Sequence, residues 1–293
     1  MNGYNYEYAG VHFESNMEFP FFYQAAMVSA HKLFVHIEGL SMPIQTSQFI
    51  SFSNGRYFIN FQDKGYYEVE KEGIICRFKD KQFVNATICN IPFAILSILN
   101  GIIPLHGSAV ADERCVYIFV GEKGAGKSTL AYLLSTYGAF EMMGDDVIGL
   151  SSDGSGEKIA MRGTRAMKLC ESFCSFEGIS KQRELYKNWG KYIVDVPHVA
   201  TSAGKPVGQI YSIGRGDTIQ CRHIPSALVE SVLYRHVVGI PWLESLLQMP
   251  IRNLIRPVCD VPLNWLRLPA GLDVMKEKIG EVTSYLDKGA GPP

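Results

Sequence analysis

The feature that most constrains this chain is a glycine-rich run, GEKGAGKS, at residues 121–128. It fits the pattern G-x-x-x-x-G-K-[ST] at every fixed position. The matching residues are Gly121, Gly126, Lys127 and Ser128. A continuous apolar run, CVYIFV, precedes it, and an amphipathic helical pattern follows it. This order of buried strand, loop and helix predicts an α/β domain in which backbone N–H groups and a helix N-terminus face an anion.

The complete motif indicates a nucleoside-triphosphate site that uses Mg²⁺, and ATP is the nucleotide that we expect there. We expect Lys127 to reach the β- and γ-phosphates and the Ser128 hydroxyl to ligate Mg²⁺. The alternative is a glycine-rich turn that binds nothing, but strand, motif and helix occur in the required order. The expected cofactor-binding residues are Gly121, Glu122, Lys123, Gly124, Ala125, Gly126, Lys127, Ser128 and Thr129. The chain has no NKxD triplet and no LSGGQ-like run, which argues against a guanine-nucleotide switch and a transport ATPase.

Two aspartates follow the next predicted strand, AFEMM at 139–143. A Mg²⁺ held by one serine needs a carboxylate nearby, and strand ends of a doubly wound sheet converge on one edge. Two adjacent carboxylates beside phosphate oxygens are expected to differ in role. We assign Asp145 as general base toward an acceptor hydroxyl and Asp146 to Mg²⁺, directly or through water. The alternative is an ordinary polar turn.

A hairpin is predicted just before the glycine-rich loop. The runs HGSAVA and CVYIFV flank the turn-like Asp112-Glu113-Arg114. A turn centred on Glu113 pairs position 106 with position 120, which places His106 beside the loop. Its imidazole is then expected to act in catalysis, paired with Asp145 or with transferring phosphoryl oxygens. The alternative is a structural histidine.

Basic residues are expected to ring this site, because a cation stabilises charge on a transferring phosphoryl group. Arg162 and Lys191 are the favoured catalytic candidates, and Arg215 has a weaker case. The alternative for each is a solvated surface charge. The full candidate set is Arg162, Arg165, Lys168, Lys191 and Arg215.

The chain divides into two predicted domains. Residues 1–90 carry short strand-like runs bounded by Gly, Asn, Asp or Lys, typical of a small β-rich domain, and residues 91–293 have the rhythm of an α/β catalytic domain. The apolar segment Ile91–Ile103 predicts a buried helix that joins them. Ser226–Val238 and Asp273–Leu286 predict further helices. Six aromatic residues near the N-terminus either dock a peptide or, as we expect, fill a core: Tyr4, Tyr6, Tyr8, Phe21, Phe22 and Tyr23.

Composition and charge indicate which classes of binding partner and which compartment to expect. The net charge is −1 and no run of five basic residues occurs, so neither nucleic acid nor a membrane surface is an expected partner. The longest apolar stretch is too short to cross a bilayer and is interrupted by Asn100 and Gly101. Seven cysteines without a CxxC pair indicate free thiols in a reducing compartment. We therefore expect a cytoplasmic protein.

Three segments together, LHGSAV, GEKGAGKST and GDDV, resemble the catalytic domain of the HPr kinase/phosphorylase family. That P-loop family phosphorylates serine hydroxyls on proteins. The resemblance covers about residues 100–240. It implies an HPr-kinase-like catalytic fold, with Gly121–Ser128 for phosphate and Mg²⁺, Asp145 as base, His106 as its partner and Asp146 near the metal. Relatives are often oligomers, so a homo-oligomer is possible.

One departure separates the chain from the bifunctional enzymes. Their E-x-R-G-L-G signature finds its nearest match in AMRGTR, where Ala160 replaces the acidic residue. The reverse, phosphorolytic reaction is therefore not expected. The chain is more similar to the HPr-kinase-like proteins encoded with ribosomally made peptides, which include the lasso-peptide kinases. The features that it shares with them are a short β-rich front and the segments GTRAMKL and KYIVDVP.

That closer resemblance implies a serine kinase acting on the C-terminal serine of a precursor peptide. Three alternatives stay open at this point: an HPr-type protein serine kinase, a small-molecule hydroxyl kinase, and a nucleotide-gated binding module that hydrolyses ATP slowly. A peptide or small protein bearing a serine is the expected partner.

Overall fold

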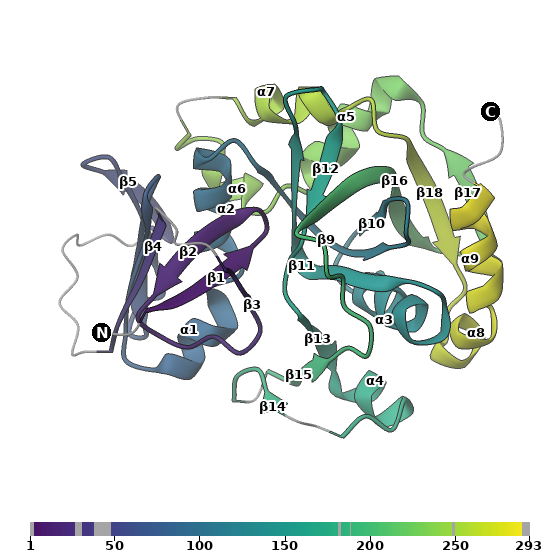
Figure 1. The fold of residues 1–293 in the computed structure, drawn as a ribbon, viewed down its shortest axis with the longest axis horizontal. Coiled ribbons are helices and arrows are strands. Elements are labelled where there is room, and N and C mark those ends of the chain that lie inside the picture. The colour runs from purple at the N-terminus through teal and green to yellow at the C-terminus, as the bar shows by residue number, and fades with distance from the viewer. Residues whose placement is uncertain are drawn as a thin grey trace.

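The computed structural model describes residues 3–26, 31–37, 48–180, 183–187, 189–247 and 250–288. Two large sheets dominate it, with a small third sheet projecting from one side (Figure 1). Helices cover the second large sheet, and one helix lies between the two (Figure 1). The structure is thus a mixed α/β fold.

The first sheet contains the N-terminal strands and agrees with the predicted β-rich front. Its hairpins include a two-residue Asn54-Gly55 turn, in which both residues have positive φ, as a type I′ turn requires. All neighbouring strands are antiparallel except β2–β4 and β4–β8. In spatial order the strands are β3 (Tyr23–Gln24), β1 (Tyr4–Tyr8), β2 (Val11–Ser15), β4 (His31–Ile37), β8 (Gly73–Phe78), β7 (Gly65–Glu70), β6 (Arg56–Asn60) and β5 (Ile50–Ser53).

The N-terminal aromatic residues form core rather than an exposed docking face. Tyr6, Tyr8, Phe21 and Phe22 are buried, and the Tyr8 hydroxyl donates a hydrogen bond to the Cys89 carbonyl at 2.9 Å. Tyr23 is half-buried, and Tyr4 is exposed. The core interpretation is confirmed for the first four.

Two helices, α1 (Lys81–Thr87) and α2 (Ile91–Leu99), follow the first sheet. α2 is apolar apart from Ser97 and is buried from Ile91 to Ile98, because it packs against β7 of the first sheet and β9 of the second. It ends earlier than predicted, since Gly101 takes a positive φ and Ile103 already begins β9. A single hydrophobic cluster therefore runs from the first sheet through α2 into the second.

The second sheet is mixed, not doubly wound as expected. β10 pairs with both β9 and β16, so that β9, β10, β16, β12 and β11 close into a ring of pairings. Only β10–β16 and β16–β18 are parallel. The strands are β9 (Ile103–Ala111), β10 (Val116–Val120), β11 (Glu141–Ser152), β12 (Lys158–Met161), β16 (Gly204–Arg215), β17 (Gln220–His223) and β18 (Leu263–Leu268).

Helices pack on both faces of this sheet. One face lies against α3 (Lys127–Tyr137), α8 (Leu272–Glu277) and α9 (Ile279–Lys288). The other lies against α5 (Ser226–Arg235), α6 (Ile240–Leu243), α7 (Ile251–Ile255) and the 3₁₀ helix Arg256–Val258. The single helix predicted over Asp273–Leu286 is thus two helices separated at Lys278, with Met275, Val282 and Leu286 still on one buried stripe.

The small third sheet contains β13 (Ala166–Cys170), β15 (Lys191–Asp195) and β14 (Arg183–Glu184), in that order, and α4 (Glu171–Phe176) follows β13 (Figure 1). Within the described ranges no single helix is long and apolar enough to span a membrane. α1 and α2 reach that length and apolarity only when taken together, and they meet at a bend of 55°.

A close backbone approach between the two large sheets provides a test of this architecture. A Cβ at Gly149 on β11 would collide with the backbone oxygen of Ala9, in the β1–β2 turn. We expect Gly149→Ala to lower the free energy of unfolding by about 2 kcal/mol, the usual cost of overpacking. The control is Gly280→Ala on α9, where the added methyl meets nothing and helix propensity predicts a gain of up to about 1 kcal/mol. Urea unfolding measures both; equal effects would contradict the contact.

Candidate active site

The glycine-rich loop joins β10 to α3, as the sequence predicted. Gly124 and Gly126 have φ of 83° and 99°, a conformation that favours glycine, and Gly126 is the N-cap of α3. No side chain caps this helix N-terminus, so its first N–H groups remain available to an anion. The Lys127 ammonium group is buried and donates to the carbonyl of Gly121 at 2.8 Å and that of Glu122 at 3.2 Å.

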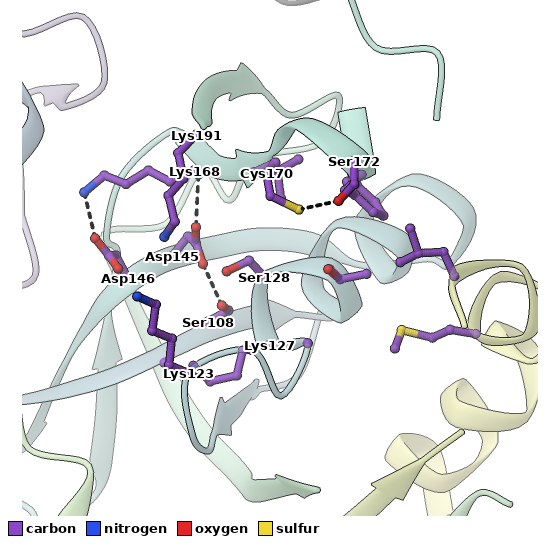
Figure 2. A pocket seen from close by; sticks show the side chains of 18 of the residues that line it. Ser108, Lys123, Lys127, Ser128, Asp145, Asp146, Lys168, Cys170, Ser172 and Lys191 are labelled. Carbon is purple, nitrogen blue, oxygen red and sulfur yellow. Dashed lines mark hydrogen bonds and ion pairs between the residues drawn. The ribbon is translucent and has the colours of Figure 1, made fainter. Parts of the chain in front are cut away.

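A cavity of about 440 Å³ opens over this loop (Figure 2). Its walls come from β9, the loop, α3, β11, the small sheet and the start of α8. Five cations and two carboxylates line it, together with His106: Lys123, Lys127, Lys168, Lys191, Arg215, Asp145 and Asp146. The excess of positive charge favours a polyanion such as a triphosphate.

The paired aspartates lie inside β11, not after its end as predicted. The strand continues to Ser152 because it stays paired with β9, where Asp145 faces Ser108 and Asp146 faces Gly107. A register shift occurs between Met142 and Gly144, and Asp146 has a φ of 74°. Regular alternation would put neighbouring side chains on opposite faces of a strand. The irregular backbone here allows both carboxylates to line one cavity.

The hairpin register differs from the prediction by one residue. Val120 pairs with Gly107, not with His106. The reason is a wider turn, in which the Asp112 carboxylate accepts hydrogen bonds from the backbone N–H groups of Arg114 and Cys115. His106 nonetheless lines the cavity, one position beyond the last pair.

Ser108 is the residue that the sequence reasoning missed. Its hydroxyl donates to Asp145 Oδ1 at 2.6 Å, and the backbone N–H of Lys168 donates to Oδ2 at 3.1 Å. Asp145 is only 2% exposed, so these two bonds fix the direction of its carboxylate. The signal was present in the run HGS, because residues two apart on a strand share a face.

The His106 side chain contacts the backbone of Asp146. Its Nδ1 lies 3.1 Å from the Asp146 carbonyl oxygen, which can only accept, so Nδ1 carries the proton and Nε2 is the free acceptor. Burial, followed by the charge of Lys127, lowers the pKa of His106 below its usual value. The ring is therefore neutral at neutral pH. The expected pairing with the Asp145 carboxylate is not formed.

Asp146 forms an ion pair with Lys168 across the cavity, with Oδ2 and Nζ 2.7 Å apart (Figure 2). Burial alone would raise the pKa of Asp146, but the charge and hydrogen bond of Lys168 outweigh it and lower the pKa to about 2. The same pairing outweighs burial at Lys168 and raises its pKa. Figure 2 also shows Ser128 turning its hydroxyl toward Asp145, whereas Asp146 faces Lys168.

The other predicted basic residues divide into two groups. Lys191 and Arg215 line the cavity, and Arg215 also donates to the Gly124 carbonyl at 3.2 Å. Arg162 lies elsewhere, against expectation. Its guanidinium is 3.0 Å from Glu7 Oε2 and stacks over the Tyr23 ring at 3.8 Å, so it joins the first sheet to the end of β12. Arg165 lines a separate surface pocket.

Several lining residues had no distinguishing pattern in the sequence. Leu272 and Met275 of α8 and Phe173 of α4 also line the cavity. They add apolar surface to a cavity that is otherwise lined mainly by charged and polar residues. Cys170 and Ser172 lie at the end of the small sheet, with Sγ and Oγ 3.3 Å apart. No described group of three or more His, Cys, Asp or Glu residues has the arrangement of a metal centre.

No family model matches the chain, and no curated protein matches it in sequence. Among solved structures, it is similar to the HPr(Ser) kinase/phosphatase from Coxiella burnetii. The identity is 16% and the TM-score is 0.34, over 64% of this chain and 99% of that chain. A score of this size leaves the function to be argued from the site itself.

The Asp146–Lys168 pair yields a prediction for stability. Lys168→Met leaves a buried carboxylate without its cation, which should cost about 3 kcal/mol of unfolding free energy at about pH 7. In the native protein the depressed pKa of Asp146 contributes stability above its ordinary pKa of 3.8, and this is lost as the pH falls toward 2. In the variant burial instead raises that pKa, so stability is lost as the pH rises.

The deficit of Lys168→Met should therefore shrink between about pH 7 and pH 4, as urea unfolding at each pH will measure. Lys278→Met is the control. That lysine forms an exposed pair with Glu281 at 3.6 Å, for which a cost below about 1 kcal/mol is expected. A deficit for Lys168→Met that does not vary with pH would refute the assignment.

Proposed function

We propose that the protein is an ATP- and Mg²⁺-dependent kinase that transfers the γ-phosphate to a serine hydroxyl of a peptide. One observation carries the proposal. A buried carboxylate, Asp145, is held in a fixed direction on the wall of the cavity that contains the glycine-rich loop. A module that only bound nucleotide would have no use for a base oriented there.

The cavity suits a magnesium nucleotide. The uncapped N-terminus of α3 and the surrounding lysines supply donors and positive charge for the phosphates. Ser128 can hold the metal by its hydroxyl. Asp146 can act through a metal-bound water, because Lys168 engages only its Oδ2. Magnesium commonly keeps several waters and takes few protein ligands, so the small donor set fits it. The bound ion would neutralise charge on the phosphate oxygens.

The transfer step follows from these positions. The acceptor oxygen attacks the γ-phosphorus, the bond from that phosphorus to the ADP oxygen breaks, and the hydroxyl proton passes to Asp145. Lys127 stabilises the charge of the transferring group. His106 offers an unprotonated Nε2 and serves as a neutral neighbour, not as a cation. Phosphoryl transfer depends mainly on positioning and charge neutralisation, which this arrangement can supply.

We further propose that the acceptor is a peptide whose C-terminal serine enters beside the small sheet, as in precursors of ribosomally made peptides. The segments GTRAMKL and KYIVDVP pair as β13 and β15 and form that side of the cavity. Lys191, at the start of β15, offers a cation to the terminal carboxylate next to the acceptor hydroxyl. An internal loop of a folded protein has no terminal carboxylate for Lys191 to bind, so a peptide with a C-terminal serine is the favoured acceptor.

The first test separates catalysis from binding. Asp145→Asn should retain ATP affinity within about threefold yet lower kcat by about a hundredfold or more, since general bases contribute about 10²–10⁴. Lys127→Ala should weaken both ATP binding and transfer. The control, Asp153→Asn, changes an exposed turn carboxylate and should leave both unchanged. Calorimetry gives the affinity and phosphopeptide formation gives kcat; normal transfer by Asp145→Asn would show that it is not the base.

The second test identifies the acceptor. Peptides ending in serine, their amidated forms and HPr are incubated with the protein, ATP and Mg²⁺, and their intact masses are measured. We expect one added phosphate on the free C-terminal serine and less on the amide. Transfer to HPr alone would indicate a protein kinase. Bound ATP with no transfer to any of them would favour a small-molecule acceptor or a nucleotide-gated module.

A further inference from the structure

A second groove lies beside the cavity, on the exposed face of strands β16, β18 and β17. Its volume is about 520 Å³. The strand register places Ser212, Trp265 and Arg222 opposite one another in one row and Arg267 opposite Gln220 in the next. These side chains therefore share one face of the sheet.

None of the helices in the described ranges packs on this part of the sheet face. Further back along the same face, Ile210 pairs with Leu263, and both are fully buried under the core that includes α5 and α7. Beyond them the face is open, and Trp265 is 43% exposed. The opposite face of the same strands packs on α3, α8 and α9. A large aromatic side chain at the end of a well-packed sheet is thus left partly exposed to solvent.

The charge of the groove is strongly one-sided. Three arginines line it, Arg215, Arg222 and Arg267, and none of the described residues that line it is acidic. The whole chain has a net charge of −1, so this concentration of positive charge is local. Guanidinium groups bind carboxylates in bidentate fashion, and an aromatic face accommodates the apolar part of a peptide. Charge complementarity therefore points to an acidic peptide.

The groove and the cavity share one lining residue. Arg215 lines both and bonds to the Gly124 carbonyl of the glycine-rich loop. The carboxyl ends of the parallel strands β10, β16 and β18 also meet at this edge. A chain bound in the groove can thus lead into the cavity.

We propose that this groove binds an acidic segment of the peptide acceptor that lies upstream of its C-terminal serine. This inference rests on the proposed kinase function for the identity of the acceptor. The binding itself depends on Arg222, Arg267 and Trp265, none of which belongs to the phosphate-binding or proton-accepting groups.

The test uses the full chain and two fluorescein-labelled peptides. One carries a run of aspartates upstream of a C-terminal serine, and the other has asparagine at those positions. Anisotropy gives the Kd of each in low salt and in high salt, with a non-hydrolysable ATP analogue present. The double variant Arg222→Gln/Arg267→Gln removes the charge of the groove. The control, Arg183→Gln/Arg256→Gln, removes the same charge from exposed arginines outside it.

The aspartate peptide should bind at least about tenfold more tightly than the asparagine peptide, and high salt should reduce the difference. The groove variant should lose that preference, while its affinity for the ATP analogue stays within about twofold of that of the unmodified protein. The control variant should keep the peptide preference within about twofold. Trp265 is one of three tryptophans. In a Trp189→Phe/Trp242→Phe background, binding of the aspartate peptide should change the fluorescence of Trp265.

Equal binding of the two peptides, or an unchanged preference in the groove variant, would overturn the proposal. Loss of ATP-analogue affinity in the groove variant, without an effect on peptide binding, would assign the groove to the nucleotide and also overturn it. Binding of the aspartate peptide that depends on the two arginines, but without phosphate transfer to its serine, would support the groove and instead refute the proposed kinase function.

Discussion

The site depends on the pairing of β9 with both β10 and β11. This one strand brings the loop that follows β10 and the carboxylates of β11 to opposite sides of itself, with Ser108 between them. Its position is enforced by the closed ring of strands, because a slip along any pair would break the next one. The Ser108–Asp145 hydrogen bond of 2.6 Å is the direct result. The direction of the Asp145 carboxylate therefore derives from sheet closure, not from a flexible loop.

Electrostatics divides the two adjacent aspartates. Asp146 is neutralised by Lys168, whereas Asp145 accepts only uncharged donors, a hydroxyl and a backbone N–H. A carboxylate with a cation already beside it is less available to a proton than one held by neutral groups. This difference in partners is the reason why Asp145, not Asp146, is proposed as the proton acceptor.

The first sheet contributes to the site indirectly. Arg162 couples it to β12 through Glu7 and Tyr23, and α2 is buried between the two sheets. A buried ion pair of this kind specifies how surfaces meet more than it adds net stability. The first sheet therefore acts as a support, and the groove lined by Trp265 lies on the second sheet.

Local patterns were enough to predict the loop, its strand and helix and the buried α2, because each depends on residues close together in the chain. The tertiary structure decided the rest. The side chain of Asp112 widened a turn and moved the hairpin register by one residue, and the separate pairing of β9 with β11 brought Ser108 to Asp145. Arg162 found its partner 155 residues away, while Lys168 took the place expected for it. Ion pairs form between charged groups that lie close together in the folded protein. The distances between such groups depend on how the strands pair, and they cannot be read from the sequence.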